Sequence, residues 1–278
     1  GDLLDLLLDG RFGETHPYGH PTIGSVPDLD AARLDDVTAF HSTWYRPDNA
    51  VLVISGCVEA DEGLLLAEKY LGAVPTATGD LPTRIQGPVR HDNPRVVVER
   101  PVPRTAVTRS WATPPITDPD NLAVAMAIDA IGSGMSSRLI RALERERHLV
   151  DGVAMNDFGL SRGSSAALVS AHLKPGVPEE ELTGAVDEII AEFAANGPRE
   201  AELERARAQV ERDWLESLAV VDERADLLNM HETLLGDANL VNTHLDRVRA
   251  ITAAQVTEAA KRWLSPEQAS TVVHKEVA

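Results

Sequence analysis

From residue 95 onward, the candidate strands and helices of this chain come in pairs rather than in strict alternation. Runs rich in β-branched residues predict strands, and apolar residues at three- and four-residue intervals predict helices. The expected strands lie at 95–102, 106–113, 149–156, 165–173 and 269–276, and the expected helices at 119–132, 136–148, 178–195, 198–235 and 252–264. This order predicts an α+β fold in which helices cover one side of a sheet.

The part of the chain before residue 95 predicts a smaller set of elements. A helical pattern runs from Asp30, the expected N-cap, to Arg46. Ala50–Cys57 is uncharged and rich in β-branched residues, which predicts a buried strand, and Glu59–Leu71 returns to a helical period. Residues 72–93 are rich in Pro and Gly with little periodicity, which is typical of a linker.

The composition excludes some classes of partner. The 278 residues include 26 Lys and Arg against 44 Asp and Glu, a formal net charge of −18. A field of that sign repels phosphate backbones and anionic lipid, so we expect neither nucleic acid nor a membrane as a partner. No apolar stretch approaches the ~20 residues that span a bilayer. The single cysteine, Cys57, rules out an intramolecular disulfide.

The start of the chain resembles the middle of an amphipathic helix. Gly1–Leu8 has neither a basic leader nor a small-residue cleavage site. A native start normally shows a cap or a loose tail before such a helix. We therefore expect further sequence upstream of Gly1. The composition predicts a cytoplasmic protein, and a signal peptide in the upstream sequence stays open.

The histidines do not form a zinc motif. A zinc hydrolase places two imidazoles on one helical face beside a glutamate, as H-E-x-x-H or H-x-x-E-H, and neither spacing occurs here. His16 and His20 are four residues apart, but the Pro and Gly residues around them prevent a helix, so we expect two loop histidines that hold a turn. His172 falls in an expected strand, and His231 has no second histidine at helical spacing.

Two further candidates have ordinary structural explanations. Gly132–Ser137 superficially resembles a dinucleotide-binding loop, but it lacks the third glycine and follows a helix, so we expect a helix–helix turn. Cys57 ends the expected apolar strand, where a thiol behaves as a small hydrophobic side chain rather than a nucleophile. Taken alone, these residues disclose no activity.

Three segments carry a family resemblance. The first runs from His16-Pro17-Tyr18-Gly19-His20-Pro21 through Tyr45-Arg46-Pro47-Asp48-Asn49-Ala50 to Glu68-Lys69-Tyr70-Leu71-Gly72. The second is Gly132-Ser133-Gly134-Met135-Ser136-Ser137-Arg138-Leu139, and the third is Ala201-Glu202-Leu203-Glu204-Arg205-Ala206-Arg207. Together they resemble the pitrilysin–insulinase family of inverted-motif zinc metallopeptidases, whose second domain carries G-G-G-x-S-S-R-L.

The resemblance implies a division of the chain. In this family a subunit contains two similar α+β domains, each a mixed or antiparallel sheet flanked by helices. Residues 1–75 are then the C-terminal part of the first domain, 76–93 a linker, and 94–278 a complete second, non-zinc domain. The H-x-x-E-H motif then lies upstream, so zinc is expected in the parent protein and none on this chain, which is expected to be inactive alone.

The resemblance also implies which catalytic groups are missing. The second domain of many members has an Arg and a Tyr in the pattern L-R-x-x-x-x-L-x-Y, which donate hydrogen bonds to the scissile carbonyl oxygen. Here Glu144 stands at the Arg position and Asp151 at the Tyr position. Ionised carboxylates only accept hydrogen bonds and repel a developing oxyanion. We therefore expect no catalytic residue in this chain, unless Arg145 or Arg147 has been re-aimed.

The implied function is hydrolysis of peptides inside a clamshell chamber by zinc-polarised water. The implied partners are peptide substrates, a second subunit of the family in a hetero- or homodimer, and the missing N-terminal fragment. In a heterodimer the second subunit would supply the Arg and Tyr. The alternative is a non-catalytic structural subunit of the same family. An upstream H-x-x-E-H would support the enzyme, and its absence would support the structural subunit. An unrelated acidic binding module would require all three segments to match by coincidence.

Overall fold

The computed structural model describes residues 6, 8, 10, 12–13, 16–76, 79–82 and 95–276. The chain divides into two compact units, each assembled from separate stretches of sequence. Unit 1 takes residues 1–21, 86–210 and 246–278, and unit 2 takes 22–85 and 211–245. Among the described residues, none of the helices is both long enough and apolar enough to cross a membrane.

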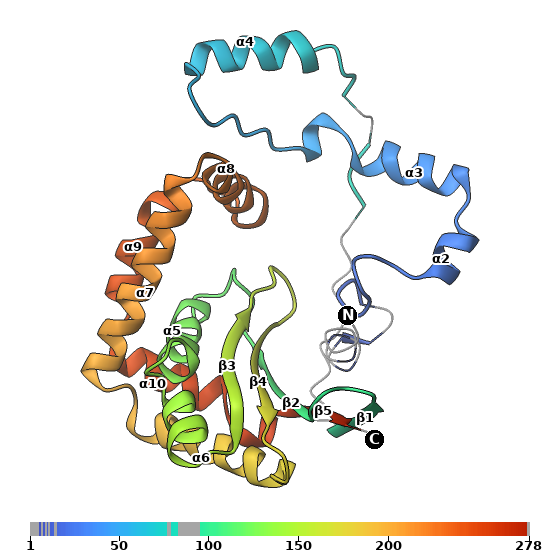
Figure 1. Cartoon of the computed structure of the whole chain (residues 1–278). Coiled ribbons are helices and arrows are strands. Elements are labelled where there is room, and N and C mark those ends of the chain that lie inside the picture. Colours follow the sequence, from blue (N-terminus) through green and yellow to red (C-terminus); the bar gives the residue numbers. More distant parts are fainter. Residues whose placement is uncertain are drawn as a thin grey trace. The chain divides into compact units, whose positions relative to one another are not determined.

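A five-stranded mixed sheet forms the centre of unit 1 (Figure 1). Its strands are β1 (Arg95–Arg100), β2 (Ala106–Thr113), β3 (Val150–Phe158), β4 (Ser165–Leu173) and β5 (Ser270–Glu276). Their order in the sheet is β1-β5-β2-β4-β3. β1 and β5 are parallel, and the other neighbours are antiparallel. β5 therefore joins β1 to the rest of the sheet.

Helices cover one face of this sheet. The helices and turns of unit 1 are α5 (Asn121–Gly132), the π-helix η2 (Ile140–Glu146), α6 (Glu179–Asn196), α10 (Ala253–Trp263) and the 3-10 turn η4 (Pro266–Gln268). The unit boundary falls within α7 (Glu200–Ala219) and α9 (Leu240–Ala250). Alternate strand residues share one buried core with α5, α6 and α10, among them Val107, Trp111, Val169, Val273, Ile128, Ile190 and Val256. Trp111 is fully buried, and its indole N–H donates to the Ser265 carbonyl oxygen at 2.9 Å.

The α+β fold expected from the sequence is confirmed. All five strands expected after residue 95 are present, and β4 has the expected bounds. The expected helix at 198–235 is wrong as one element, because Val220 is extended (φ −89°, ψ 128°) between α7 and α8 (Val221–Met230), which the π-helix η3 (His231–Leu235) follows. Two adjacent β-branched residues, Val220 and Val221, lower helix propensity at this point. α9 was not expected, and η2 replaces the helix expected at 136–148.

The N-terminal part of unit 2 contains α2 (Val26–Ala31), α3 (Leu34–Trp44), the 3-10 turn η1 (Pro47–Asn49) and α4 (Ala60–Leu71). The expected N-cap at Asp30 is wrong, because Asp30 lies inside α2. Ser25 caps α2 instead, its hydroxyl accepting the Asp28 amide at 3.2 Å. α3 begins after Arg33 and ends before the Arg46-Pro47 step, close to the expected end.

The buried strand expected at Ala50–Cys57 is wrong. Residues 51–55 adopt no regular structure, and Leu52 and Ile54 are 57% and 46% exposed. A strand needs a neighbour for its backbone N–H and C=O groups, and no strand of the described residues pairs with this stretch. Cys57 is consequently exposed rather than packed in a core.

Candidate functional site

The start of the first matching segment forms a turn around His16. Its imidazole is 4% exposed, accepts the Tyr18 amide at Nδ1 (3.0 Å), and stacks on Phe12 with ring centroids 4.5 Å apart. Burial lowers the pKa of His16, which favours the neutral ring. His20 is exposed. Of the two histidines expected to hold the turn, only His16 packs inside it.

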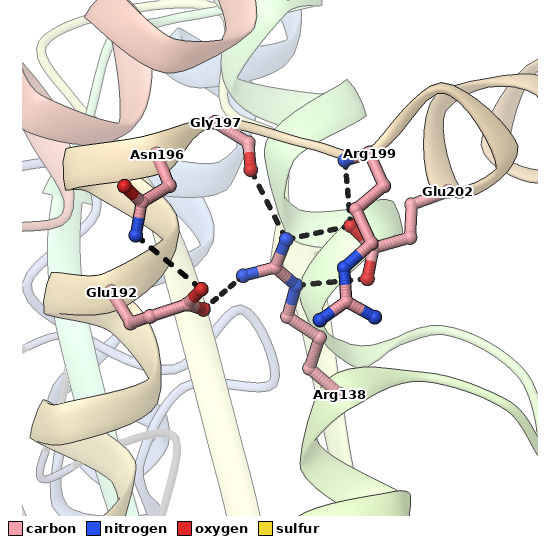
Figure 2. Close-up of polar contacts among 6 residues, drawn as sticks. All are labelled: Arg138, Glu192, Asn196, Gly197, Arg199 and Glu202. Atoms are coloured by element: carbon pink, nitrogen blue, oxygen red, sulfur yellow. Dashed lines mark hydrogen bonds and ion pairs between the residues drawn. The ribbon is translucent and has the colours of Figure 1, made fainter.

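The second and third segments meet at Arg138 (Figure 2). The guanidinium donates from Nε and Nη2 to the two carboxylate oxygens of Glu202, at 2.9 and 2.6 Å. Nη2 also donates to the Gly197 carbonyl oxygen at 3.1 Å, and Nη1 donates to Glu192. The guanidinium carbon lies 4.8 Å from the ring centre of Phe193. All three nitrogens are thus engaged by α6, α7 and the loop between them.

The Arg138–Glu202 pair is buried, with side-chain exposures of 4% and 8%. Burial alone raises the pKa of Glu202, but the hydrogen bonds from Arg138 and from the Arg199 amide outweigh it, and the pKa lies below its usual value. The Arg199 amide donates to Glu202 at 2.8 Å. Glu202 is the third residue of α7, so this bond satisfies an otherwise unpaired N–H at the helix start. The cluster is therefore a structural clamp, with no nitrogen of Arg138 left over for a ligand.

The two positions that the resemblance assigns to hydrogen-bond donors both hold carboxylates. Glu144 is half-buried on η2, and its carbonyl oxygen lies 3.0 Å from Nδ1 of His148. Asp151 lies at the start of β3, where the pairing with β4 shifts register between Val150 and Gly152. Its carboxylate accepts a hydrogen bond from Arg104, in the connection between β1 and β2.

Neither Arg145 nor Arg147 forms an ion pair with Asp151 in the part of the chain that the structure describes. Nη2 of Arg147 donates to Glu188 of α6 at 2.8 Å, and Arg145 is exposed. The guanidinium at Asp151 belongs to Arg104 instead, 47 residues earlier in the chain. Sequence reasoning missed Arg104, because nothing in a short strand connection indicates which distant strand end it meets. That this chain has no catalytic residue stays a prediction.

The described side chains do not fit a zinc ion. Protein zinc sites use three or four His, Cys, Asp or Glu ligands. No group of three or more such side chains is placed to hold a metal within the described residues. His231 is buried on η3, with Nδ1 2.8 Å from the Leu227 carbonyl oxygen, and His172 is exposed on β4. No chemical step through zinc is derived for these residues.

Residues 31–210 match the family described as the peptidase M16 inactive domain. The chain belongs to this family. The resemblance noted in the sequence is confirmed, and the matched range contains both Arg138 and Glu202.

Relatives of this M16 chain are longer than it is. An uncharacterized zinc protease of Mycobacterium leprae is 24% identical over 273 residues, which cover 98% of this chain and 61% of the relative. The chain thus spans about three fifths of the length of the curated relatives that it first matches.

Solved structures share the M16 fold. A protease from Helicobacter pylori has a TM-score of 0.84 at 19% identity, covering 99% of this chain and 70% of its own. A chain in complex III from Candida albicans has a TM-score of 0.81 at 16% identity, covering 99% and 66%. At these identities the likeness shows the fold alone. The fold therefore occurs both in a protease and in a chain of complex III.

Proposed function

We propose that this chain is the C-terminal portion of a subunit of a zinc-dependent metalloendopeptidase. The observation that carries the proposal is the match to an M16 inactive domain, in a chain whose relatives are named zinc proteases and are longer. In this proposal residues 94–278 are the second, non-zinc domain, 76–93 are the linker, and 1–75 are the end of the first domain. The metal motif belongs to the part of the parent protein upstream of this chain.

The role proposed for the second domain is to enclose and contact peptide substrates rather than to cleave them. Two features support this role. Glu144 and Asp151 are acceptors where the family pattern has donors, and the described residues bring no metal-ligand group together. In a heterodimer, a partner subunit would then supply the donors that stabilise the carbonyl oxygen during hydrolysis, whereas a second copy in a homodimer would carry the same two carboxylates. The proposal includes a cytoplasmic location, which fractionation of cells that express the parent protein tests.

Unit 2 supports the idea that further polypeptide packs on residues 22–76. Large apolar side chains of its helices are exposed, among them Leu34 (80%), Phe40 (58%), Leu65 (71%) and Tyr70 (68%). A pocket of about 620 Å³ lies between Trp44 and Val74 and is lined mainly by apolar residues. Exposed apolar area of this kind marks a contact surface. We propose that the upstream part of the first domain covers it in the parent protein, or that copies of the chain associate through it.

The experiment is a cleavage assay on the full-length parent protein. The parent is expressed with and without its candidate partner subunit and mixed with an internally quenched peptide. The proposal expects cleavage that a zinc chelator abolishes and that Zn²⁺ restores, and none from residues 1–278 alone. A Glu→Gln change in an upstream H-x-x-E-H is the matched inactive control. Absence of zinc-dependent cleavage from the parent, both alone and with its partner, would refute the proposal.

The second candidate function is a non-catalytic subunit that only helps to assemble a complex. The observation in its favour is that both donor positions hold carboxylates. The sequence upstream of residue 1 separates the two candidates. An H-x-x-E-H there supports the peptidase, and a parent protein without that motif supports the assembly role.

A further inference from the structure

A second site lies at one end of the sheet of unit 1. A pocket of about 520 Å³ is lined by the β1–β2 connection with Arg104, by Ala106 of β2, by Asp151 and Gly152 of β3, by His172 of β4 and by His274 of β5. Its volume lies within the ~300–1,000 Å³ of typical ligand sites. Of its lining residues, only Asp151, which stands at the family's Tyr position, enters the proposed proteolytic function.

Strand register places the two imidazoles on one face. Ala106 pairs with His172 on one side and with His274 on the other, and Gly152 pairs with His172. Directly paired residues project from the same face of a sheet. Their sequence neighbours Val107, Ala171 and Val273 lie in the core. Ala106, His172 and His274, which form one row across the sheet, therefore face away from the helices.

In this row the small side chain of Ala106 lies between the two larger imidazoles of His172 and His274. Strands lie about 4.8 Å apart, so His172 and His274 are about 10 Å apart at the backbone, with only the methyl group of Ala106 between them. Beyond His172, Gly152 has no side chain, and a Cβ there would meet nothing within 4 Å. In the next row of the same face, Thr108 and Val272 are both buried, each 3% exposed. The space above Ala106, between the two imidazoles, therefore ends at the buried row of Thr108 and Val272.

The pocket offers more hydrogen-bond donors than acceptors. Arg104 has five N–H groups and donates to Asp151, the only carboxylate among the lining residues. The ion pair offsets the negative charge of Asp151, which alone would repel an anion, and it holds the guanidinium at the pocket while other N–H groups of Arg104 stay unused. Neither imidazole has a hydrogen-bond partner among the described residues. Each ring carries at least one N–H in either neutral tautomer. A ligand that only accepts hydrogen bonds fits this arrangement.

We propose that this pocket binds a carboxylate group, through Arg104, His172 and His274. The Arg104 guanidinium presents paired N–H groups that match the two oxygens of a carboxylate. The two imidazoles donate from either side, above Ala106. A divalent metal ion is the poorer fit, because no three His, Cys, Asp or Glu side chains of the described residues are placed to hold one, and the carboxylate in the pocket, Asp151, is paired with Arg104. The carboxylate comes either from a polypeptide, as an acidic side chain or a C-terminus, or from a free organic acid.

The test follows the histidine side chains of the full chain by NMR, with the imidazole carbons labelled. The nine histidines give few signals, and His172→Gln and His274→Gln assign the two that matter. Three amidated Gly-Ser peptides are titrated in turn, with a central Glu, a central Gln, and a central Gln with the C-terminal amide replaced by a carboxylate. Acetate is titrated separately as the free-acid arm. His20→Gln is the control, because His20 is exposed and lies outside the pocket.

The proposal expects the signals of His172 and His274 to shift with the carboxylate probes and not with the amidated Gln peptide. Arg104→Gln should weaken binding about tenfold or more, as expected for the loss of hydrogen bonds to a charged group. Stronger binding of the Glu peptide than of acetate assigns the ligand to a polypeptide, and equal binding assigns it to a free acid. Equal shifts with the Gln peptide, unchanged binding in Arg104→Gln, or no shift with any probe would overturn the proposal. The variants' circular dichroism spectra show whether they remain folded.

Discussion

Replacing Arg138 by Met should destabilise unit 1, because the carboxylate of Glu202 then stays buried without its ion-pair partner. Glu202 is 8% exposed and receives two hydrogen bonds from Arg138. Without them its carboxylate keeps one donor, the Arg199 amide. Removal of one member of a buried ion pair costs about 3–5 kcal/mol, because the remaining charge is neither solvated nor paired. We expect a loss of that size in the free energy of unfolding of Arg138→Met at pH 8, measured by urea denaturation.

The double variant Arg138→Met/Glu202→Leu tests whether the loss of stability comes from the unpaired charge of Glu202, because apolar side chains then fill the space of both residues. It removes both charges and leaves the Gly197 carbonyl oxygen and the Arg199 amide without their partners. Each lost hydrogen bond costs about 1 kcal/mol, so we expect a total loss of about 2 kcal/mol, smaller than that of either single variant. Arg212→Met is the control, because its ion pair with Asp213 is exposed, and no change is expected.

The pH dependence gives a second check on Arg138→Met. In the native protein the pKa of Glu202 is lowered, so its contribution to stability is present above its unfolded pKa and is lost as pH falls. In the variant, burial without Arg138 raises that pKa above the unfolded value, so stability should be lost as pH rises. The deficit should therefore be smaller at pH 5 than at pH 8. A double variant as unstable as the sum of the single variants, or a deficit that grows at low pH, would refute the reasoning.

Three further variants test other features by urea denaturation. Asp157 is exposed on β3, yet its carboxyl is partly desolvated, and this desolvation, with the charge of Asp129, raises its pKa to about 6. Its ionised form therefore costs stability as pH rises through that value. Asp157→Asn should gain about 1 kcal/mol at pH 8, a value reduced for its solvent exposure, and nothing at pH 4; a gain at pH 4 would contradict this. A Cβ on Gly132 would lie 2.1 Å from the Met155 Cβ, so Gly132→Ala should lose about 2–3 kcal/mol. Gly184→Ala, inside α6 with nothing within 4 Å of the added Cβ, should gain about 0.5–1 kcal/mol; similar results for the two glycines would show that the packing argument is wrong.

Elements with a strong local pattern could be predicted from the sequence. β4 is a run of small and apolar residues, interrupted only by His172, and its bounds match the expected 165–173. α4 follows the apolar period of Glu59–Leu71 and begins at Ala60. In both cases the residues that set the period are close together in sequence, so the local pattern is sufficient.

Elements that depend on distant partners could not be predicted in this way. Ala50–Cys57 has the composition of a buried strand, but burial requires a neighbouring strand that local sequence does not specify. The helix break at Val220 is the opposite kind of error. The apolar period continues through this position, so the pattern predicts a continuous helix where the helix in fact ends. Propensity is a weak predictor wherever tertiary contacts decide the outcome.

In the candidate sites, too, the sequence located individual residues but not the contacts between residues that are far apart in the chain. The family pattern located Glu144 and Asp151 and contained Arg138, but the pairing of Arg138 with Glu202 spans 64 residues and has no local signal. The row that joins His172 to His274 through Ala106 depends on strand register. Register follows from how the whole sheet assembles, so these two histidines could be related only once the pairing was known.

The place of β5 in the sheet affects how a newly made chain folds. Until residues 270–276 have left the ribosome, β1 has no hydrogen-bonded neighbour among the described strands, and β2 has one free edge. Free edges pair readily with other polypeptides, and closing so long a loop is slow. Nascent chains should therefore need protection by chaperones until synthesis has passed β5. Deletion of this one strand should cause aggregation of the product rather than the loss of a small local feature.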